Sequence, residues 1–258
     1  MTATTRAEVS SQVSFGGAFA SEWLKARSLR STWWLSASAI VSMAVVTAFW
    51  SAAAGGGPTE ASVLDALSTG FFACEIMLIL VGTIISTADY ENHAISVFIA
   101  AVPRRTPIVL SKVLLSALIG LVVTALATAL SFAVSVALHG GGASLGSPAV
   151  LRVLGDIVVF GACIAVIATS AGLVLRSTIG TVGATLGFLY IVPIVIGLIP
   201  LDVFTLISDT FPGNAATNFF ATTADPGRLD PVTGLIATLL WTAAWVAFAV
   251  VWVKRRNA

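Results

Sequence analysis

A serine flanked by glycines is the first feature of this chain that could carry out chemistry. The G-x-S-x-G pattern occurs at residues 142–146, and His139 lies just before it. In hydrolases this pattern exposes a nucleophilic serine on a turn from a strand to a helix. Here it falls in a glycine-rich segment, residues 139–149, between two long apolar runs. We therefore interpret it as a flexible turn.

The histidines and the remaining glycines do not form a metal or nucleotide site either. His93 and His139 are separated by a whole apolar run, which as a helix holds them about 30 Å apart, so they cannot share a metal ion. No lysine follows residues 55–57 or 140–142 in the way that a phosphate-binding P-loop requires. We expect no catalytic residue, no metal site and no cofactor bound by this chain.

Glu75 is the one carboxylate well inside an apolar run. An acidic group near the centre of a bilayer costs roughly 3 kcal/mol, and such groups usually face the interior of a helix bundle. A functional interpretation makes Glu75 a polar point on a transport pathway or a proton-linked group. The structural alternative is a hydrogen bond to a Ser or Thr of a neighbouring helix, or a span that begins later. We retain Glu75 as a possible pathway residue.

The elements that must position these residues are long apolar helices. Of the 258 residues, 57% are hydrophobic and 10% are charged, whereas soluble domains carry roughly a quarter charged residues. The runs are continuously apolar, without the alternation of a membrane β-barrel, so we predict an all-α polytopic membrane protein. About 20 residues cross a bilayer as a helix. Six spans are predicted, at about residues 33–54, 67–88, 113–138, 150–175, 179–200 and 232–253.

The distribution of lysine and arginine predicts how these spans are oriented. All but two of the 13 lysines and arginines lie either before the first span or in the segments that follow the second, fourth and sixth spans. The exceptions are Arg152 and Arg228. Cations mark the cytoplasmic side, so both termini are expected there, in a multi-pass protein of the cell (cytoplasmic) membrane. The net charge of +1 provides no basic field for nucleic acid.

Shorter elements are predicted at both faces of the membrane. Residues 15–30 carry aromatic side chains every fourth residue and then cations, which indicates an amphipathic helix in the cytoplasmic interface. Residues 201–231 are predicted to form an outer re-entrant or interfacial hairpin of two short helices, capped by Asp202 and Asn214 with a turn at Pro212-Gly213. The alternative for residues 15–30 is a tail that happens to contain aromatic residues. The alternative for residues 201–231 is an ordinary extracellular loop.

In the fifth predicted span, Gly183 and Gly187 form a G-x-x-x-G pattern, which predicts close approach of another helix. Pro193 is expected to kink the same span.

Residues 89–112 form the most informative cytoplasmic segment. Asp89, Tyr90 and Glu91 follow the second span, an apolar stretch and a Pro-Arg-Arg turn come next, and the chain re-enters through Lys112. An ordinary positive-inside loop explains the arginines but not the apolar stretch, residues 95–102. The pattern favours docking to another protein.

The order of these motifs resembles the permease subunits of type-2 ABC exporters. The resemblance covers most of the chain and depends on residues 21–34 (SEWLKARSLRSTWW), on the 89–112 segment, and on the long loop before the last span with its basic tail. Relatives often carry Gly and a basic residue after the acidic-Tyr pair, where this chain has Asn92-His93 and the neutral Ser96.

The resemblance implies one permease domain over residues 1–258 that is not itself an enzyme. A separate ABC ATPase subunit would hold ATP and Mg and would dock against the interfacial helix and the 89–112 coupling corner. A second permease subunit, identical or paralogous, would complete the pathway for an unidentified hydrophobic or amphipathic substrate. The residues implied in ATPase coupling are Trp23, Lys25, Arg27, Arg30, Asp89, Tyr90, Glu91, Arg104 and Arg105. An ion-gradient-driven secondary transporter and a non-transporting membrane scaffold remain the alternatives.

Overall fold

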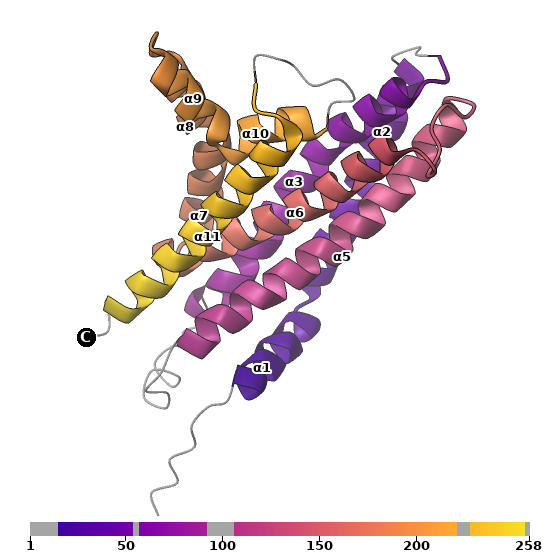
Figure 1. Cartoon of the computed structure of the whole chain (residues 1–258). Helices are drawn as coiled ribbons and strands as arrows, with labels where there is room; N and C mark the ends of the chain where they lie inside the picture. The colour runs from indigo at the N-terminus through magenta and orange to yellow at the C-terminus, as the bar shows by residue number, and fades with distance from the viewer. Residues whose placement is uncertain (1–14, 54–56, 92–105, 221–227, 256–258) are drawn as a thin grey trace, which may run out of the picture.

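The apolar runs form helices, because a backbone inside lipid must satisfy its hydrogen bonds within each segment. The computed structural model describes residues 15–53, 57–91, 106–220 and 228–255 (Figure 1). The regular elements in these ranges are all helical: α1 (Phe15–Ser28), α2 (Arg30–Ala53), α3 (Glu60–Glu91), α5 (Thr106–Leu138), α6 (Pro148–Leu175), α7 (Thr178–Leu186), η1 (Gly187–Ile191), α8 (Val192–Gly197), α9 (Asp202–Thr210), α10 (Pro212–Phe219) and α11 (Pro231–Arg255).

Six of the described helical stretches are long and apolar enough to cross a membrane: α2, α3, α5, α6, the α7–η1–α8 stretch and α11. This confirms the predicted all-α polytopic membrane protein. Both α3 and α5 begin seven residues before the predicted spans, at Glu60 and Thr106. Helical hydrogen bonding extends beyond the apolar run. Glu60 stands in the first turn of α3, where its carboxylate interacts favourably with the helix dipole.

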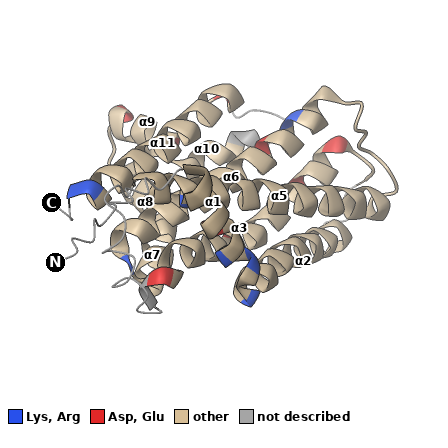
Figure 2. Cartoon of the chain, turned by 90° about the horizontal axis from the view of Figure 1, so that it is seen from below, with Lys and Arg blue, Asp and Glu red and all other residues tan. Residues whose placement is uncertain are grey.

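Helix α6 is the centre of the bundle. It packs against α3, α5 and α11, whereas α2 packs on α3 and α5. In the most apolar stretch of α6, 83% of the residues are buried, against 17% in α11. Most of the exposed large apolar side chains belong to helices other than α6. Figure 2 shows that charged residues lie mainly near helix ends.

Small residues allow the central helices to approach closely. A Cβ atom at Gly82 of α3 would lie 2.4 Å from the carbonyl oxygen of Ala165 in α6, and one at Gly120 of α5 would lie 2.9 Å from the Ala165 Cβ. At Gly183 and Gly187 a Cβ would meet no atom within 4 Å. The prediction that these two glycines pack against another helix is therefore wrong within this chain, because that side of α7 and η1 faces away from the described bundle.

The fifth span departs from α-helical geometry before its proline. The segment Gly187–Ile191 is a π-helix, and the backbone N–H of Val192 donates to the carbonyl oxygen of Gly187, five residues earlier. Pro193 has no N–H, so it cannot donate to the carbonyl of Leu189 as an α-helix requires. The predicted irregularity occurs one turn ahead of Pro193, and it includes Tyr190.

The segment before α11 contains the two expected short helices, α9 and α10, but the predicted caps are wrong. Leu201 occupies the N-cap of α9, and Asp202 stands in its first turn. Asn214 lies inside α10, where its Nδ2 donates to the carbonyl oxygen (3.1 Å) and hydroxyl (3.0 Å) of Ser208 in α9. Pro212 begins α10, a position that requires no backbone donor. Asn214 thus ties the two helices together.

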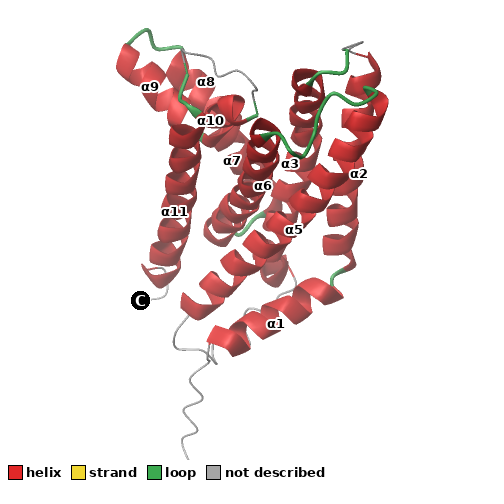
Figure 3. Cartoon of the chain, turned by 45° about the vertical axis from the view of Figure 1, so that its right-hand side comes forward, coloured by secondary structure: helices red, strands yellow, loops and turns green. Residues whose placement is uncertain are grey.

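Helix α1 ends at Ser28, and α2 begins at Arg30 after a break at Leu29. Helix α1 and the C-terminal end of α11 lie at one end of the bundle, and α9 and α10 lie at the other (Figure 3). The even number of spans explains why both ends of the described chain lie together. The placement of α1 in a membrane interface and of residues 201–231 on the outer side stays a prediction.

Candidate functional site

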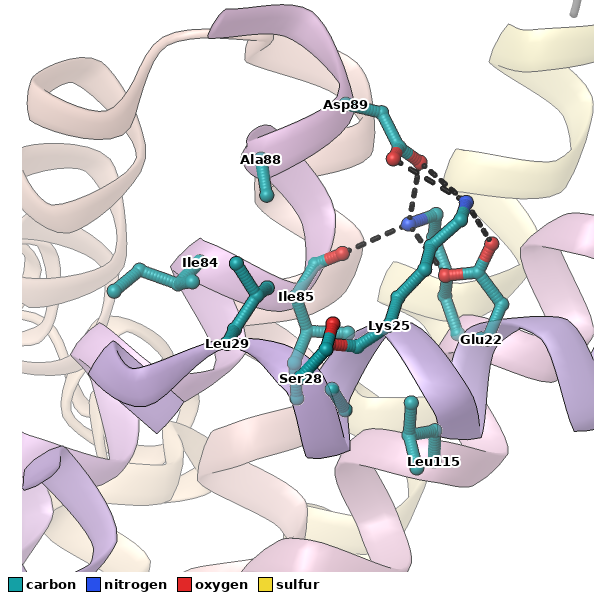
Figure 4. Close-up of a pocket in the computed structure, with 11 residues that line it drawn as sticks. Glu22, Lys25, Ser28, Leu29, Ile84, Ile85, Ala88, Asp89 and Leu115 are labelled. Carbon is teal, nitrogen blue, oxygen red and sulfur yellow. Dashed lines mark hydrogen bonds and ion pairs between the residues drawn. The ribbon is translucent and has the colours of Figure 1, made fainter. Parts of the chain in front are cut away.

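Four charged side chains from three helices meet beneath α1 (Figure 4). Glu22 and Lys25 come from α1, Asp89 from the last turn of α3, and Lys112 from the second turn of α5. We call these four residues the ion-pair cluster. It joins the ends of α3 and α5 that flank residues 92–105 to the helix that precedes the first span.

Lys112 is the most enclosed member of the cluster. Its Nζ lies 2.8 Å from Oε2 of Glu22, 2.9 Å from Oδ2 of Asp89 and 2.9 Å from the carbonyl oxygen of Ile85. A lysine ammonium has three donors, and each has an acceptor here. The side chains of Lys112 and Glu22 are both only 5% exposed, so an ammonium that would be costly to bury alone is fully paired.

Lys25 closes the arrangement on its more exposed side. Its Nζ lies 2.8 Å from Oε1 of Glu22 and 3.3 Å from both carboxylate oxygens of Asp89. Each carboxylate therefore bridges both lysines, and the four charges cancel. Burial lowers the pKa of Lys25, but hydrogen bonding and charge from Glu22 and Asp89 outweigh this effect and raise the pKa above its ordinary value of 10.5. The cluster thus favours the charged form of Lys25.

A pocket of about 210 Å³ lies beside the cluster (Figure 4). The ionic groups form one part of its lining, and the rest is mostly apolar: Ala26, Leu29, Ile84, Ile85, Ala88 and Leu115. Ala26, Ile85 and Leu115 also belong to a small buried core in which Phe19 of α1 is packed. Both apolar packing and ion pairs therefore hold α1 against α3 and α5. A displacement of one helix end strains both kinds of contact.

The structure brings together two of the residues predicted to couple to an ATPase, Lys25 and Asp89. Trp23, Arg27 and Arg30 are exposed and take no part in the cluster. The backbone of α3 extends through residues 90–91, but the side chains of Tyr90 and Glu91 lie outside the described part of the chain.

Arg104 and Arg105 also lie outside the described residues. The ends of α3 and α5 fix where the 92–105 connection starts and finishes, and the ion-pair cluster stands at those ends.

Sequence reasoning assigned no role to Glu22 and Lys112, the most buried members of the cluster. A local signal existed for each. Glu22 stands three residues before Lys25, the spacing of an intrahelical ion pair. Lys112 is a cation near the start of a long apolar helix, and a lysine in such surroundings needs a counter-charge.

Glu75 forms a second, separate polar site in the middle of α3. The residue is 2% exposed, and one carboxylate oxygen, Oε2, accepts a hydrogen bond from the hydroxyl of Tyr190 in η1. The other oxygen, Oε1, is buried and has no hydrogen-bond partner among the described residues. Glu75 therefore does face the bundle interior, but its partner is a tyrosine rather than a serine or threonine.

The residues of the hydrolase-like pattern form a turn. The hydroxyl of Ser144 accepts from the backbone N–H of Gly146 at 3.1 Å, whereas Nδ1 of His139 lies 3.0 Å from the carbonyl oxygen of Ser135, the residue one turn earlier. No group of three or more His, Cys, Asp or Glu side chains that could hold a metal occurs within the described ranges.

Neither a protein-family model nor a curated protein sequence matches the chain.

Proposed function

We propose that this chain is the membrane-spanning permease subunit of an ATP-binding cassette exporter, driven by a separate ATPase subunit. The six-span helical fold and the motifs of residues 21–34 and 89–112 support this proposal. The observation that carries it is the ion-pair cluster, in which Lys112 joins Glu22 of α1 to Asp89 of α3.

The cluster suits the transmission of force. Residues 92–105 connect α3 to α5, so a partner that pushes on this connection displaces both helix ends. Asp89 and Lys112 lie at those ends, and both are paired with α1. Helices α3 and α5 each pack on the central helix α6. Movement at the corner would therefore reach α1 and the centre of the bundle together.

The partners follow from what the chain lacks and what it exposes. The sequence has no P-loop, so ATP and Mg would be bound by the partner ATPase. Trp23, Arg27 and Arg30 are exposed on and beside α1 and offer a surface for that partner or for lipid headgroups. A second permease subunit would complete the pathway, and the membrane would be the cytoplasmic membrane, with α1 on its inner side.

Affinity purification from the native membrane tests this proposal. We expect the solubilised chain to bring down an ATPase subunit that contains a P-loop, in stoichiometric amount. Arg27→Glu should reduce that recovery, because Arg27 is exposed on α1. Arg228→Glu makes the same charge change next to α11, at the opposite end of the bundle, and should leave recovery unchanged. Purification without any ATPase would contradict the proposal.

Glu75 favours a second candidate, a secondary transporter driven by an ion gradient. A buried carboxylate in the middle of a span is the kind of residue on which proton or ion coupling depends. Vesicles that contain this chain alone distinguish the two functions: gradient-driven uptake would support the secondary transporter, and transport only when an ATPase and ATP are added would support the exporter. A membrane scaffold would transport in neither experiment.

A further inference from the structure

The unshared oxygen of Glu75 is a buried polar group that the coupling mechanism does not use. Oε2 accepts the Tyr190 hydroxyl, while Oε1 has no partner among the described residues. None of the ion pairs found in the described part of the chain includes Glu75. The described part of the chain thus provides this carboxyl group with one hydrogen bond and no positive charge.

This arrangement differs from that of the other deeply buried carboxylate, Glu22. Glu22 is paired with two lysines, as a buried charge normally is. Buried in this way, Glu75 either takes up a proton, which removes its charge, or needs a cation from outside the described residues to offset the cost of burial. The unpartnered oxygen therefore points to a ligand rather than to a structural contact.

Aromatic residues precede Glu75 on α3, its hydrogen-bond partner Tyr190 is also aromatic, and together they indicate what kind of cation would fit. Phe71 and Phe72 stand four and three residues before Glu75, so they lie on the same side of α3. The ring centroids of Phe72 and Tyr190 are 6.5 Å apart. Aromatic faces attract organic cations, whereas Mg²⁺ and Ca²⁺ take about six or more oxygen ligands. One carboxylate and one phenol suit an ammonium or phosphonium group better than a metal.

The position of the site in the bundle gives such a ligand access. Phe72 is 56% exposed, and Ile76, the residue after Glu75, is also exposed, so exposed side chains of α3 flank the buried carboxyl group in the sequence. Tyr190 belongs to the π-helical turn Gly187–Ile191, and π-helical turns are frequent at functional sites. This turn lies in a span of which only 22% of the residues are buried.

We propose that Glu75 and Tyr190, together with Phe72, form a binding site for a lipophilic organic cation, and that such cations are the substrate class of the transporter. The carboxylate provides the counter-charge, and the rings of Phe72 and Tyr190 contact the apolar groups around the cationic centre. The identification of the cation as the transported substrate rests on the proposed function. Binding itself requires only this chain.

Equilibrium dialysis with radiolabelled tetraphenylphosphonium tests the site in the full-length chain, reconstituted in phosphatidylcholine nanodiscs. We expect saturable binding above that of empty nanodiscs. Glu75→Gln should weaken binding by at least about tenfold, because the amide keeps the hydrogen bond but not the charge. Glu60→Gln removes the same charge at the start of the same helix and should change nothing. Tetraphenylborate, of similar shape but opposite charge, should show no saturable binding.

A second measurement on the unaltered chain covers the case in which Glu75→Gln does not fold. Dicyclohexylcarbodiimide modifies carboxyl groups in apolar surroundings, and mass spectrometry quantifies the adduct at Glu75. Saturating tetraphenylphosphonium should protect Glu75 from modification, and tetraphenylborate should not. Equal binding by the wild type and a folded Glu75→Gln variant, or modification that the cation does not slow, would overturn the site.

The two proposals fail in different ways. Recovery of the ATPase without cation binding would contradict the substrate site alone. Cation binding without recovery of an ATPase would contradict the exporter alone.

Discussion

The Nζ atom of Lys112 lies 2.8 Å from Oε2 of Glu22, although 90 residues separate them in the sequence. Both side chains are 5% exposed. Two buried charges at this distance hold α1 against α5, while Asp89, which Lys112 also contacts, extends the connection to α3. The relationship makes the helix before the first span part of the bundle rather than a loosely attached segment.

Lys112→Met should destabilise the protein strongly. It leaves the buried Glu22 without the more buried of its two counter-charges, and removing one partner of a buried pair costs about 3–5 kcal/mol. Lys25→Met is the matched control: Lys25 is 33% exposed, and a partly exposed ion pair contributes about 1 kcal/mol or less. Thermal unfolding in one detergent compares the two variants. Equal losses would show that the depth of Lys112 in the cluster has no energetic consequence.

Asp89→Asn should separate ATP hydrolysis from transport in the complex with the proposed ATPase. The amide has the shape of the carboxylate but loses the charge that attracts both lysines. The link between α3 and α1 is thereby weakened, while the exposed docking surface is unchanged. We expect ATP hydrolysis near the wild-type rate and a several-fold lower amount of substrate moved per ATP.

The control for that experiment is Asp156→Asn. Asp156 pairs with Arg152 within one helix, α6, at an Nη1–Oδ2 distance of 3.4 Å, so this ion pair lies within a single element. If both variants lower transport per ATP by the same factor, the cluster has no special part in coupling.

The stability that Lys25 contributes should disappear at high pH. Its pKa in the folded chain is above the ordinary 10.5, despite burial, because Glu22 and Asp89 favour its charged form. A group whose pKa is raised by folding contributes its full stabilisation below the pKa of the unfolded state. That stabilisation is lost as the pH rises through the pKa of the folded state. The difference in melting temperature between wild type and Lys25→Met should therefore be constant up to about pH 10 and should narrow above 10.5.

Because other lysines titrate in both proteins, only the difference between them reports on Lys25. A difference that widens above pH 10.5 would contradict the raised pKa.

Gly82→Ala and Gly183→Ala should have opposite effects on stability. A Cβ at Gly82 would lie 2.4 Å from the Ala165 carbonyl oxygen, so α3 and α6 must move apart, at a cost of about 1–3 kcal/mol. A Cβ at Gly183 meets nothing within 4 Å, and alanine in a helix is favoured over glycine by about 0.5–1 kcal/mol. Melting temperatures of the two variants check both signs. Destabilisation by Gly183→Ala would indicate a partner for that face of α7, such as a second subunit.

These glycines also illustrate how far sequence reasoning reaches. The six spans were predictable because each is a run of about 20 apolar residues, which is a local property. The G-x-x-x-G spacing of Gly183 and Gly187 is equally local, but the contact it predicts depends on which helix lies opposite. Gly82 and Gly120 make the close contacts without that spacing, because both face the central helix α6.

In the candidate site, too, only the features that depend on local sequence could be predicted. The position of Asp89 at the end of a span and of Lys25 in a cationic helix could be predicted from spacing. The pairing of Lys112 with Glu22 could not, since it depends on how α1 turns back beneath α5. Asn214 shows a similar limit: it has the side chain of a helix cap, but it lies inside α10 and donates to Ser208 of the preceding helix.

Tyr190→Phe should destabilise the protein by about 1–3 kcal/mol, because it leaves the buried carboxyl group of Glu75 without its hydrogen-bond donor. Combining it with Glu75→Leu should recover most of that loss, since replacing both partners of a buried hydrogen bond by apolar groups can be nearly neutral. Thermal unfolding of the two variants in the same nanodiscs measures the difference. A double variant less stable than Tyr190→Phe alone would mean that Glu75 stabilises the fold through another group. A double variant that regains stability but no longer binds tetraphenylphosphonium would separate the role of Glu75 in the fold from its role in binding. It would show that the carboxylate is needed for the ligand and not for the fold.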